Sequence, residues 1–165
     1  MTDEIVIRRA SPRDVGKMLT FVNRARRGMP KIDRGQLLQW FGEHGYMLAE
    51  VDGDLHAVVG WHTEDFIARI RQVIIYPARL RTTVGRTLLD AVRQSAVELM
   101  CEVVLLFPEL EASERARRFY RSCGFEAVSP DDLIPAWQSA AQQSMPAECF
   151  VMMQKLREKR VMRPV

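Results

Sequence analysis

Apolar residues along this 165-residue chain recur at helical spacing in some segments and at strand-like spacing in others. The first segment is a β-branched run at 5–7, which predicts a strand. Ser11-Pro12 and Asp14 follow, and the apolar side chains from there to Val22 fall on one helical face. Serine can accept a hydrogen bond from a free amide at a helix start, proline fits the first turn, and an acidic residue complements the helix dipole. We therefore expect a strand followed by a helix.

The next interval, 33–44, has the same helical pattern. Its apolar side chains Leu37, Leu38 and Phe41 are expected to face inward, and Gly45 is suited to end the helix. The chain is thus predicted to begin with one strand and two helices.

An antiparallel meander is predicted after these helices. Strand-like runs at 46–51 and 55–61 flank residues 52–54, an Asp-Gly-Asp sequence typical of a tight hairpin turn. The run at 70–75 continues the sheet, and Pro77 ends it because proline cannot donate a hydrogen bond to a ladder.

The second half of the chain returns to alternating helices and strands. Helical spacing over 84–99 precedes a continuous apolar run at 103–107, which is typical of a strand buried on both faces and parallel to a neighbour. A helix from Ser113 is expected to end before Gly124, which supplies the left-handed residue of a helix C-cap. Two final strands are expected at 125–128 and 149–153.

These elements predict the order β-α-α-β-β-β-α-β-α-β-β. The fold class is α/β (α+β), with a mixed, mostly antiparallel central sheet flanked by helices. The chain has the length of one domain, and its 47% hydrophobic content is enough for one core, so 1–165 is expected to be a single domain. Residues 157–165 are expected to form a flexible basic tail.

Charge and cysteine content argue against several classes of protein. The net charge is +3, but the basic residues are scattered among 21 acidic ones, so a solvated surface is favoured over nucleic-acid binding. The three cysteines lack metal-ligand spacing, so neither a disulfide framework nor a metal site is expected. Because the chain has no long apolar run and its first residues are acidic, we expect no membrane span and a cytoplasmic protein.

The segment 74–89 leads from the predicted strand through a short loop into a helix, and this junction is suited to anions. The amides of a first helical turn point outward, and the helix dipole adds partial positive charge. Gly85 leaves the backbone accessible to a ligand, and Arg79, Arg81 and Arg86 add cations that could pair with phosphate oxygens.

A second block, 113–125, reads Ser-Glu-Arg-Ala-Arg-Arg-Phe-Tyr-Arg-Ser-Cys-Gly-Phe. The two blocks, in this order, resemble the GNAT superfamily of N-acetyltransferases. The stretch 80–85 corresponds to the family's Arg/Gln-x-x-Gly-x-Gly/Ala, but only Gly85 matches, since Leu80 and Thr83 replace the usual Arg or Gln and the first glycine. In the second block serine stands where the family commonly has asparagine, and the Phe-Tyr-x-x-x-Gly-Phe end is intact.

The resemblance implies an N-acetyltransferase that takes acetyl-CoA as co-substrate and transfers its acetyl group to an amine by direct attack in a ternary complex. It implies that Tyr120 protonates the departing thiolate, although a tyrosine at this helical spacing is also typical of core packing. It further implies that the pantetheine arm bonds to the strand before the loop. The residues implied in coenzyme binding are Val73, Ile74, Ile75, Leu80, Arg81, Thr82, Thr83, Val84, Gly85, Arg86, Ser113 and Tyr120.

The glutamate that many members carry on this strand has no counterpart, because 68–73 contains no carboxylate. His62, Glu64 and Asp65 are the nearest candidates for a general base. These departures leave a second hypothesis, a catalytically degenerate module of the same fold that serves in binding or regulation. The acceptor, a small-molecule or peptide amine, stays open, as does a homodimer.

The segment 129–147 is far longer than an ordinary hairpin loop. Ser129-Pro130 repeats the helix-start chemistry of the first helix, so we expect a short helix whose regularity is limited by Pro135. Trp137 is expected either to line an acceptor site or a subunit interface, or to pack on the segment's own core.

Overall fold

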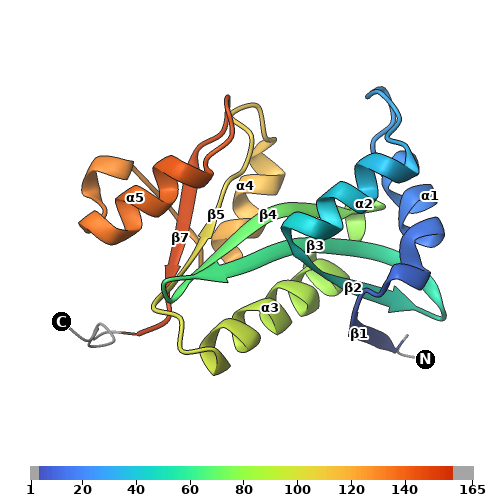
Figure 1. Cartoon of the computed structure of the whole chain (residues 1–165), viewed down its shortest axis with the longest axis horizontal. Coiled ribbons are helices and arrows are strands. Elements are labelled where there is room, and N and C mark those ends of the chain that lie inside the picture. The colour runs from blue at the N-terminus through green and yellow to red at the C-terminus, as the bar shows by residue number, and fades with distance from the viewer. Residues whose placement is uncertain (1–3, 158–165) are drawn as a thin grey trace. The chain divides into compact units, whose positions relative to one another are not determined.

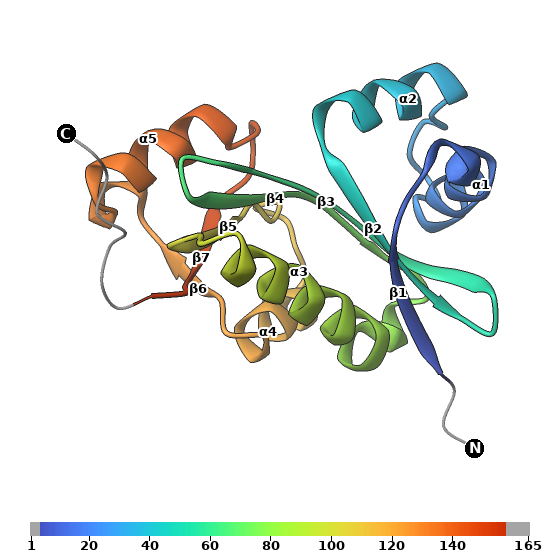
Figure 2. The same ribbon diagram turned by 60° about the horizontal axis from the view of Figure 1, so that its bottom comes forward.

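The computed structural model describes residues 4–157, so all but the first residue of the predicted tail at 157–165 lies outside the described residues (Figures 1 and 2). The strands are β1 (Ile5–Arg9), β2 (Gly45–Val51), β3 (Asp54–Glu64), β4 (Ile67–Ile75), β5 (Val103–Leu106), β6 (Glu126–Val128) and β7 (Val151–Lys155). The helices are α1 (Val15–Ala25), α2 (Arg34–Glu43), α3 (Arg86–Glu98), α4 (Glu114–Ser122) and α5 (Pro135–Ser144).

The strands form a seven-stranded sheet in the order β1-β2-β3-β4-β5-β7-β6. β4 pairs with β5 in parallel, whereas β1 with β2, β2 with β3, β5 with β7 and β6 with β7 are antiparallel. All four residues of β5 are buried, as its continuous apolar run predicts. The predicted fold class is confirmed, and the predicted order needs one addition, because α5 lies between β6 and β7.

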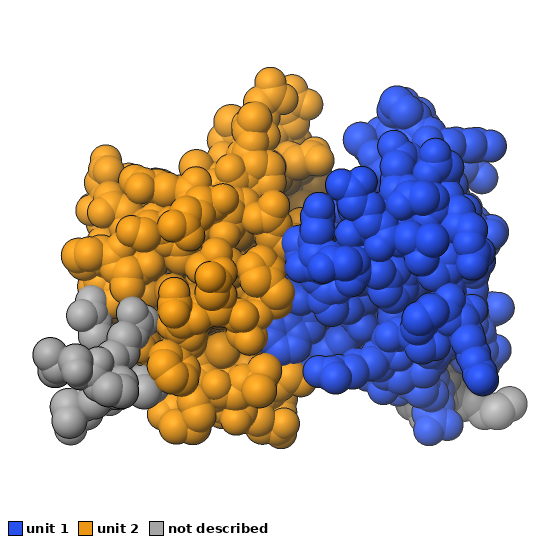
Figure 3. Space-filling model, in the orientation of Figure 1, with its two compact units in different colours: residues 1–61, 72–92 blue, residues 62–71, 93–165 orange. Residues whose placement is uncertain are grey.

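The chain folds into two compact units (Figure 3). Unit 1 consists of residues 1–61 and 72–92, and unit 2 consists of residues 62–71 and 93–165. β4 and α3 each contribute residues to both units. A single domain over the whole chain stays a prediction.

In unit 1, α1 and α2 cover one face of the sheet formed by β1, β2 and β3, and the first part of α3 lies on the opposite face (Figure 2). Side chains alternate along a strand, so each face of this sheet receives every second residue. The core between the sheet and the first two helices is formed by Val15, Met18, Phe21, Val22, Ile32, Leu37, Tyr46, Leu48, Leu55 and Val58.

Two local features of unit 1 shape the ends of its elements, and the turn at 52–53 forms as predicted. The Asp33 carboxylate accepts a hydrogen bond from the Gln36 amide at 2.8 Å and thereby caps α2. Asp52 and Gly53 both have positive φ, 51° and 81°, which is the backbone of a tight two-residue turn between β2 and β3.

The prediction that Leu38 faces inward is wrong, because its side chain is 45% exposed. Leu37 is fully buried, and Phe41 packs beside it, one turn further along α2. Successive helical residues point about 100° apart, so a helix that rests on the sheet through Leu37 turns Leu38 toward solvent.

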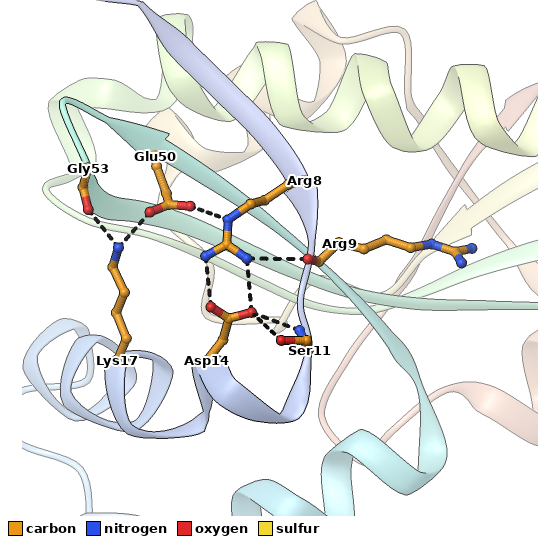
Figure 4. A network of polar contacts seen from close by, with 7 residues as sticks. All are labelled: Arg8, Arg9, Ser11, Asp14, Lys17, Glu50 and Gly53. Carbon is orange, nitrogen blue, oxygen red and sulfur yellow. Dashed lines mark hydrogen bonds and ion pairs between the residues drawn. The ribbon is translucent and has the colours of Figure 1, made fainter.

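A network of charged side chains joins β1, α1 and β2 in unit 1 (Figure 4). The Arg8 guanidinium donates to both carboxylate oxygens of Asp14, at 2.9 and 2.7 Å, and to Glu50. Lys17 donates to Glu50 at 2.5 Å, and the Ser11 amide donates to Asp14 at 2.7 Å. Burial pushes the pKa of Glu50 up, but the hydrogen bonds from Lys17 and Arg8 outweigh burial and leave the pKa below its ordinary value.

We expect this network to make the fold sensitive to acid. The hydrogen bonds from Arg8 lower the pKa of Asp14 from 3.8 to about 2. Ionised Asp14 therefore stabilises the protein above pH 4, and this stabilisation, on the order of 1–2 kcal/mol, is lost as the pH falls toward 2.

Urea unfolding between pH 2 and 6 should show a shallower decline of the unfolding free energy for Asp14→Asn than for the parent. Asp90→Asn, a change at an exposed carboxylate of α3, should decline like the parent. Equal slopes for the parent and Asp14→Asn would contradict the assignment.

In unit 2, α5 and α4 lie on opposite faces of the sheet formed by β5, β7 and β6 (Figures 1 and 2). The core under α5 consists of Ile67, Val103, Leu105, Phe107, Leu133, Trp137, Ala140, Ala141 and Val151. Ile67 belongs to β4, so α5 covers three strands of the sheet.

The segment 129–147 is helical, as expected, but its helix begins later than the serine signal indicates. Pro130–Asp132 forms one 3-10 turn, and α5 starts at Pro135, where proline suits the first turn. The indole of Trp137 is 6% exposed and donates to the Glu102 carboxylate at 3.3 Å. Of the two alternatives for Trp137, packing on its own core is the one that the structure supports.

The end of α4 forms as predicted. Gly124 has a φ of +96°, and a Cβ at this position would lie 2.7 Å from the Gln154 side chain of β7. The Phe125 amide donates to the Tyr120 carbonyl at 3.1 Å, and the Phe125 side chain is buried. This turn fixes the register of Tyr120 relative to β6 and β7.

Candidate functional site

The predicted phosphate-binding residues lie in two successive turns between β4 and α3, in unit 1. A 3-10 turn at Ala78–Leu80 is followed by a wider π-type turn at Arg81–Gly85, and α3 begins at Arg86. The helix therefore starts two residues later than its apolar spacing predicts, because the wider turn precedes it. Leu80 to Arg86 are thus brought together in one continuous junction.

Backbone hydrogen bonds run through the junction. The Leu80 amide donates to Pro77, the Arg81 amide to Ala78 and the Arg86 amide to Arg81. Thr82 and Thr83 are exposed in the wider turn, so a ligand can approach them.

The Thr83 hydroxyl has a long internal hydrogen bond, 3.4 Å to the Leu80 carbonyl oxygen. A contact of this length is weak, so the hydroxyl can rotate toward a phosphate oxygen with little loss. The threonine that replaces the family's first glycine is therefore compatible with an anion at this turn.

The junction is strongly cationic. Between 66 and 89 the chain carries five arginines and no carboxylate. Arg79 is exposed and Arg81 is half-buried, and neither forms an ion pair with any residue in the described part of the chain. Arg79 and Arg81 beside a helix start form an electrostatic environment that favours a polyanion.

The predicted pantetheine strand, Val73 to Ile75, is the end of β4 that leads into the junction. The pairing of β4 with β5 runs from Ile67 to Ile70, so these three residues lie beyond the paired part of that edge. Ile74 packs against the core of unit 1 together with Tyr76, and the Arg24 guanidinium lies 5.4 Å from the Tyr76 ring centre.

Ser113 and Tyr120 lie on α4, in unit 2. The Ser113 hydroxyl accepts a hydrogen bond from the Ala116 amide at 3.2 Å, so this serine caps the helix. Phe119 is the buried aromatic of α4, whereas Tyr120 is half-buried, with its ring centre 5.4 Å from that of Phe119. Packing alone therefore explains Phe119 better than it explains Tyr120.

The three candidate bases lie at the end of β3 and in the turn after it, in unit 2. His62 is half-buried, and Asp65 sits in the exposed turn with a φ of 54°. The Glu64 carboxylate lies 3.6 Å from the guanidinium of Arg69 on β4. The Glu64 carboxylate is thus engaged by a cation of unit 2.

Two arginines on β4, Arg69 and Arg71, form a polar cluster that sequence reasoning missed. Arg69 is 5% exposed and donates to the Ser144 hydroxyl at 3.0 Å, and Arg71 donates to the Ser144 carbonyl at 2.5 Å. The signal in the sequence is their spacing of two residues in an apolar strand, which places both side chains on one face of the sheet.

Among residues 4–157, no three His, Cys, Asp or Glu side chains come close enough together to hold a metal ion. No helix in this part of the chain is long and apolar enough to cross a membrane.

Comparisons with known proteins agree with the geometry. The model of the acetyltransferase (GNAT) family matches residues 17–125. The fold is similar to that of the ribosomal-protein-S18-alanine N-acetyltransferase from Escherichia coli, with a TM-score of 0.72 and 13% identity over 95% of this chain and 97% of that one. It is also similar to Ard1 from Thermoplasma volcanium, with a TM-score of 0.68 and 21% identity over 93% and 99% of the two chains.

A further similar structure, that of yncA from Salmonella typhimurium, was solved with its cofactor acetyl-CoA; the TM-score is 0.68, with 17% identity over 95% and 96% of the chains. No curated protein sequence matches the chain. The family model nevertheless covers more than half of the residues. The protein therefore belongs to the GNAT family of acetyltransferases and is an acyltransferase.

Proposed function

We propose that the protein is an N-acetyltransferase that transfers the acetyl group of acetyl-CoA to an amine acceptor. Family membership supports the reaction class. The observation that carries the coenzyme assignment is the junction from Leu80 to Arg86, where a helix start lies beside Arg79 and Arg81, neither of which forms an ion pair in the described part of the chain. A cytoplasmic location and a homodimer remain predictions.

In the proposed site, the coenzyme phosphates bind the amides of Thr82 and Thr83 and the side chains of Arg79 and Arg81. Backbone amides supply most of this contact, so the replacement of the family's Arg or Gln by Leu80 need not prevent binding. The backbone of Val73, Ile74 and Ile75 holds the pantetheine arm by strand-like hydrogen bonds.

The proposed reaction is a direct transfer without an acetylated enzyme. The lone pair of the amine attacks the thioester carbonyl carbon, and the tetrahedral intermediate collapses as the C–S bond breaks. The leaving thiolate takes a proton from the Tyr120 hydroxyl, and the amine nitrogen loses a proton to a base or to water.

For the base, His62, Glu64 and Asp65 all stay candidates, and the Glu64 carboxylate lies 3.6 Å from the Arg69 guanidinium. Asp65 lies in an exposed turn, where solvent can serve equally well. A water relay from His62 is compatible with its position on β3.

The first prediction tests coenzyme binding. Acetyl-CoA at about a hundred times its dissociation constant should add about 2.7 kcal/mol to the unfolding free energy and raise Tm by roughly 5–10 °C. Arg81→Glu should lower the affinity for acetyl-CoA about tenfold or more, because it replaces a phosphate-pairing cation by an anion. Isothermal titration and thermal shift would measure both effects.

Arg13→Glu is the control, since Arg13 is an exposed arginine in another helix-start turn of unit 1. It should bind acetyl-CoA like the parent. If millimolar acetyl-CoA produces no shift in the parent, the coenzyme assignment is wrong. Coenzyme binding without thiol release from a broad amine panel would instead indicate a non-catalytic binding module.

A further inference from the structure

The polar cluster of Arg69, Arg71 and Ser144 lies where one face of β4 changes from apolar to charged side chains. Ile67 packs under α5 with Trp137 and other apolar side chains of unit 2. The next two residues on that face are Arg69 and Arg71, and both donate to Ser144, the last residue of α5. The apolar interface thus ends, together with the helix, at a pair of guanidinium groups.

The positive charge of this cluster is not balanced within the described residues. Glu64 is the one carboxylate that forms an ion pair with it there, at 3.6 Å from Arg69, and its side chain is 62% exposed. Arg71 forms no ion pair in the described part of the chain, and its partner Ser144 offers a neutral carbonyl oxygen. The partial negative charge at the end of α5 offsets only part of two buried or half-buried cations.

The Arg69 guanidinium also has a buried N–H donor without a hydrogen-bond acceptor among the described residues. A guanidinium carries five N–H groups, and the Arg69 Nε is buried without a hydrogen-bond partner among residues 4–157. Capping of α5 requires one donor and accounts for the bond from Arg71 to the Ser144 carbonyl. It does not account for a second arginine that is 5% exposed and has a free Nε.

We propose that Arg69 and Arg71 bind a carboxylate of the acceptor, so that the preferred acceptor is an amine that carries a carboxylate, such as an amino acid. This inference rests on the proposed acetyl transfer. A planar carboxylate can accept two parallel hydrogen bonds from a guanidinium, which a primary amine or ammonium group cannot. Two cations on β4 also repel a polyamine by the same Coulombic interaction.

The test compares free amino acids with the same amino acids as carboxamides, with thiol release as the readout. For the parent, kcat/KM should be about tenfold or more higher for the carboxylates, mainly through KM. Arg71→Gln should remove this preference, leave the carboxamides unchanged and leave acetyl-CoA affinity unchanged. Arg71→Lys should restore only part of the preference, because lysine keeps the charge and loses the planar fork.

Arg115→Gln removes an exposed arginine from α4 in the same unit and should behave like the parent. Thermal unfolding of each variant shows whether loss of the cap has unfolded α5. Equal losses for carboxylates and carboxamides in Arg71→Gln, or a parent that prefers carboxamides or polyamines, would overturn the inference. Dephospho-CoA serves as a further probe: if Arg71→Gln changes the discrimination between CoA and dephospho-CoA, the arginines bind a coenzyme phosphate instead.

A second assay separates this inference from the proposed function. Thermal shift with millimolar amino acids, in the absence of acetyl-CoA, should stabilise the parent more than Arg71→Gln. Failure of the proposed function appears as no acetyl-CoA binding and no thiol release with any amine. Thiol release without a preference for carboxylates, or no response to amino acids in either assay, contradicts the carboxylate site itself.

Discussion

Tyr120→Phe is expected to lower kcat about a hundredfold while acetyl-CoA affinity stays within about twofold of the parent. The substitution removes one oxygen from a half-buried ring and leaves its contact with Phe119. A general acid acts as the C–S bond breaks, so its loss lowers kcat and kcat/KM together and does not change ground-state binding. Steady-state kinetics by thiol release and a coenzyme titration would separate the two quantities.

Tyr46→Phe is the matched control, because it removes the hydroxyl of a second tyrosine that donates to Gln72 at 2.6 Å. It should reduce stability by about 1 kcal/mol, as expected for a partly buried hydrogen bond, and keep kcat near that of the parent. If Tyr120→Phe turns over as fast as Tyr46→Phe, Tyr120 is a packing residue and the thiolate is protonated by another group.

Trp137→Ala is expected to lower the unfolding free energy by about 3–5 kcal/mol, the largest effect on stability that we predict. The indole lies in the core of unit 2 beside Leu133, Ala140 and Ala141, and its removal leaves a cavity and takes a donor from the Glu102 carboxylate. Urea unfolding monitored by far-UV circular dichroism, a signal that does not depend on a tryptophan probe, would measure the loss of unfolding free energy.

Trp137→Phe should recover most of the packing and lose only the hydrogen bond to Glu102. Leu110→Ala, a change at a side chain that is 55% exposed, should lie within about 0.5 kcal/mol of the parent. If Trp137→Ala is no more harmful than Leu110→Ala, the helix α5 does not depend on this core.

The packing of Trp137 and its neighbours also bears on a deletion of the segment 129–147. From sequence, replacement of 129–147 by a short turn should preserve coenzyme binding, because the phosphate loop lies elsewhere. The structure places α5 over β4, β5 and β7 in unit 2, so the replacement would remove one side of that core. The shortened chain is therefore expected to lose the fold of unit 2.

Local signals in the sequence predicted the fold well wherever the partners are neighbours in the chain. The turn at Asp52 and Gly53 and the left-handed Gly124 each depend on residues within one turn, and both formed as predicted. Leu38 was misplaced because the tilt of α2 on the sheet decides which of two adjacent leucines is buried.

The polar clusters depend on residues far apart in the chain and could not be predicted in this way. Glu50 and its partner Arg8 are 42 positions apart, and Arg69 and Ser144 are 75 positions apart. Motifs in the sequence predict the coenzyme junction and the role of Tyr120, and both stay predictions. The alternating positions of Arg69 and Arg71 are visible in the sequence, but their role is not. Their shared partner, Ser144, lies on α5, far away in the chain.

The division of β4 and α3 between the two units constrains how this protein can be rearranged. Unit 1 and unit 2 are each assembled from two separate stretches of the chain, and the chain passes from one to the other after residues 61, 71 and 92. Each of these points lies inside a strand or helix, namely β3, β4 or α3, so a truncation there divides that element. Neither unit can therefore be gained, lost or transplanted as one uninterrupted gene segment, and insertions are better tolerated at exposed turns such as 52–53, where the backbone belongs wholly to unit 1.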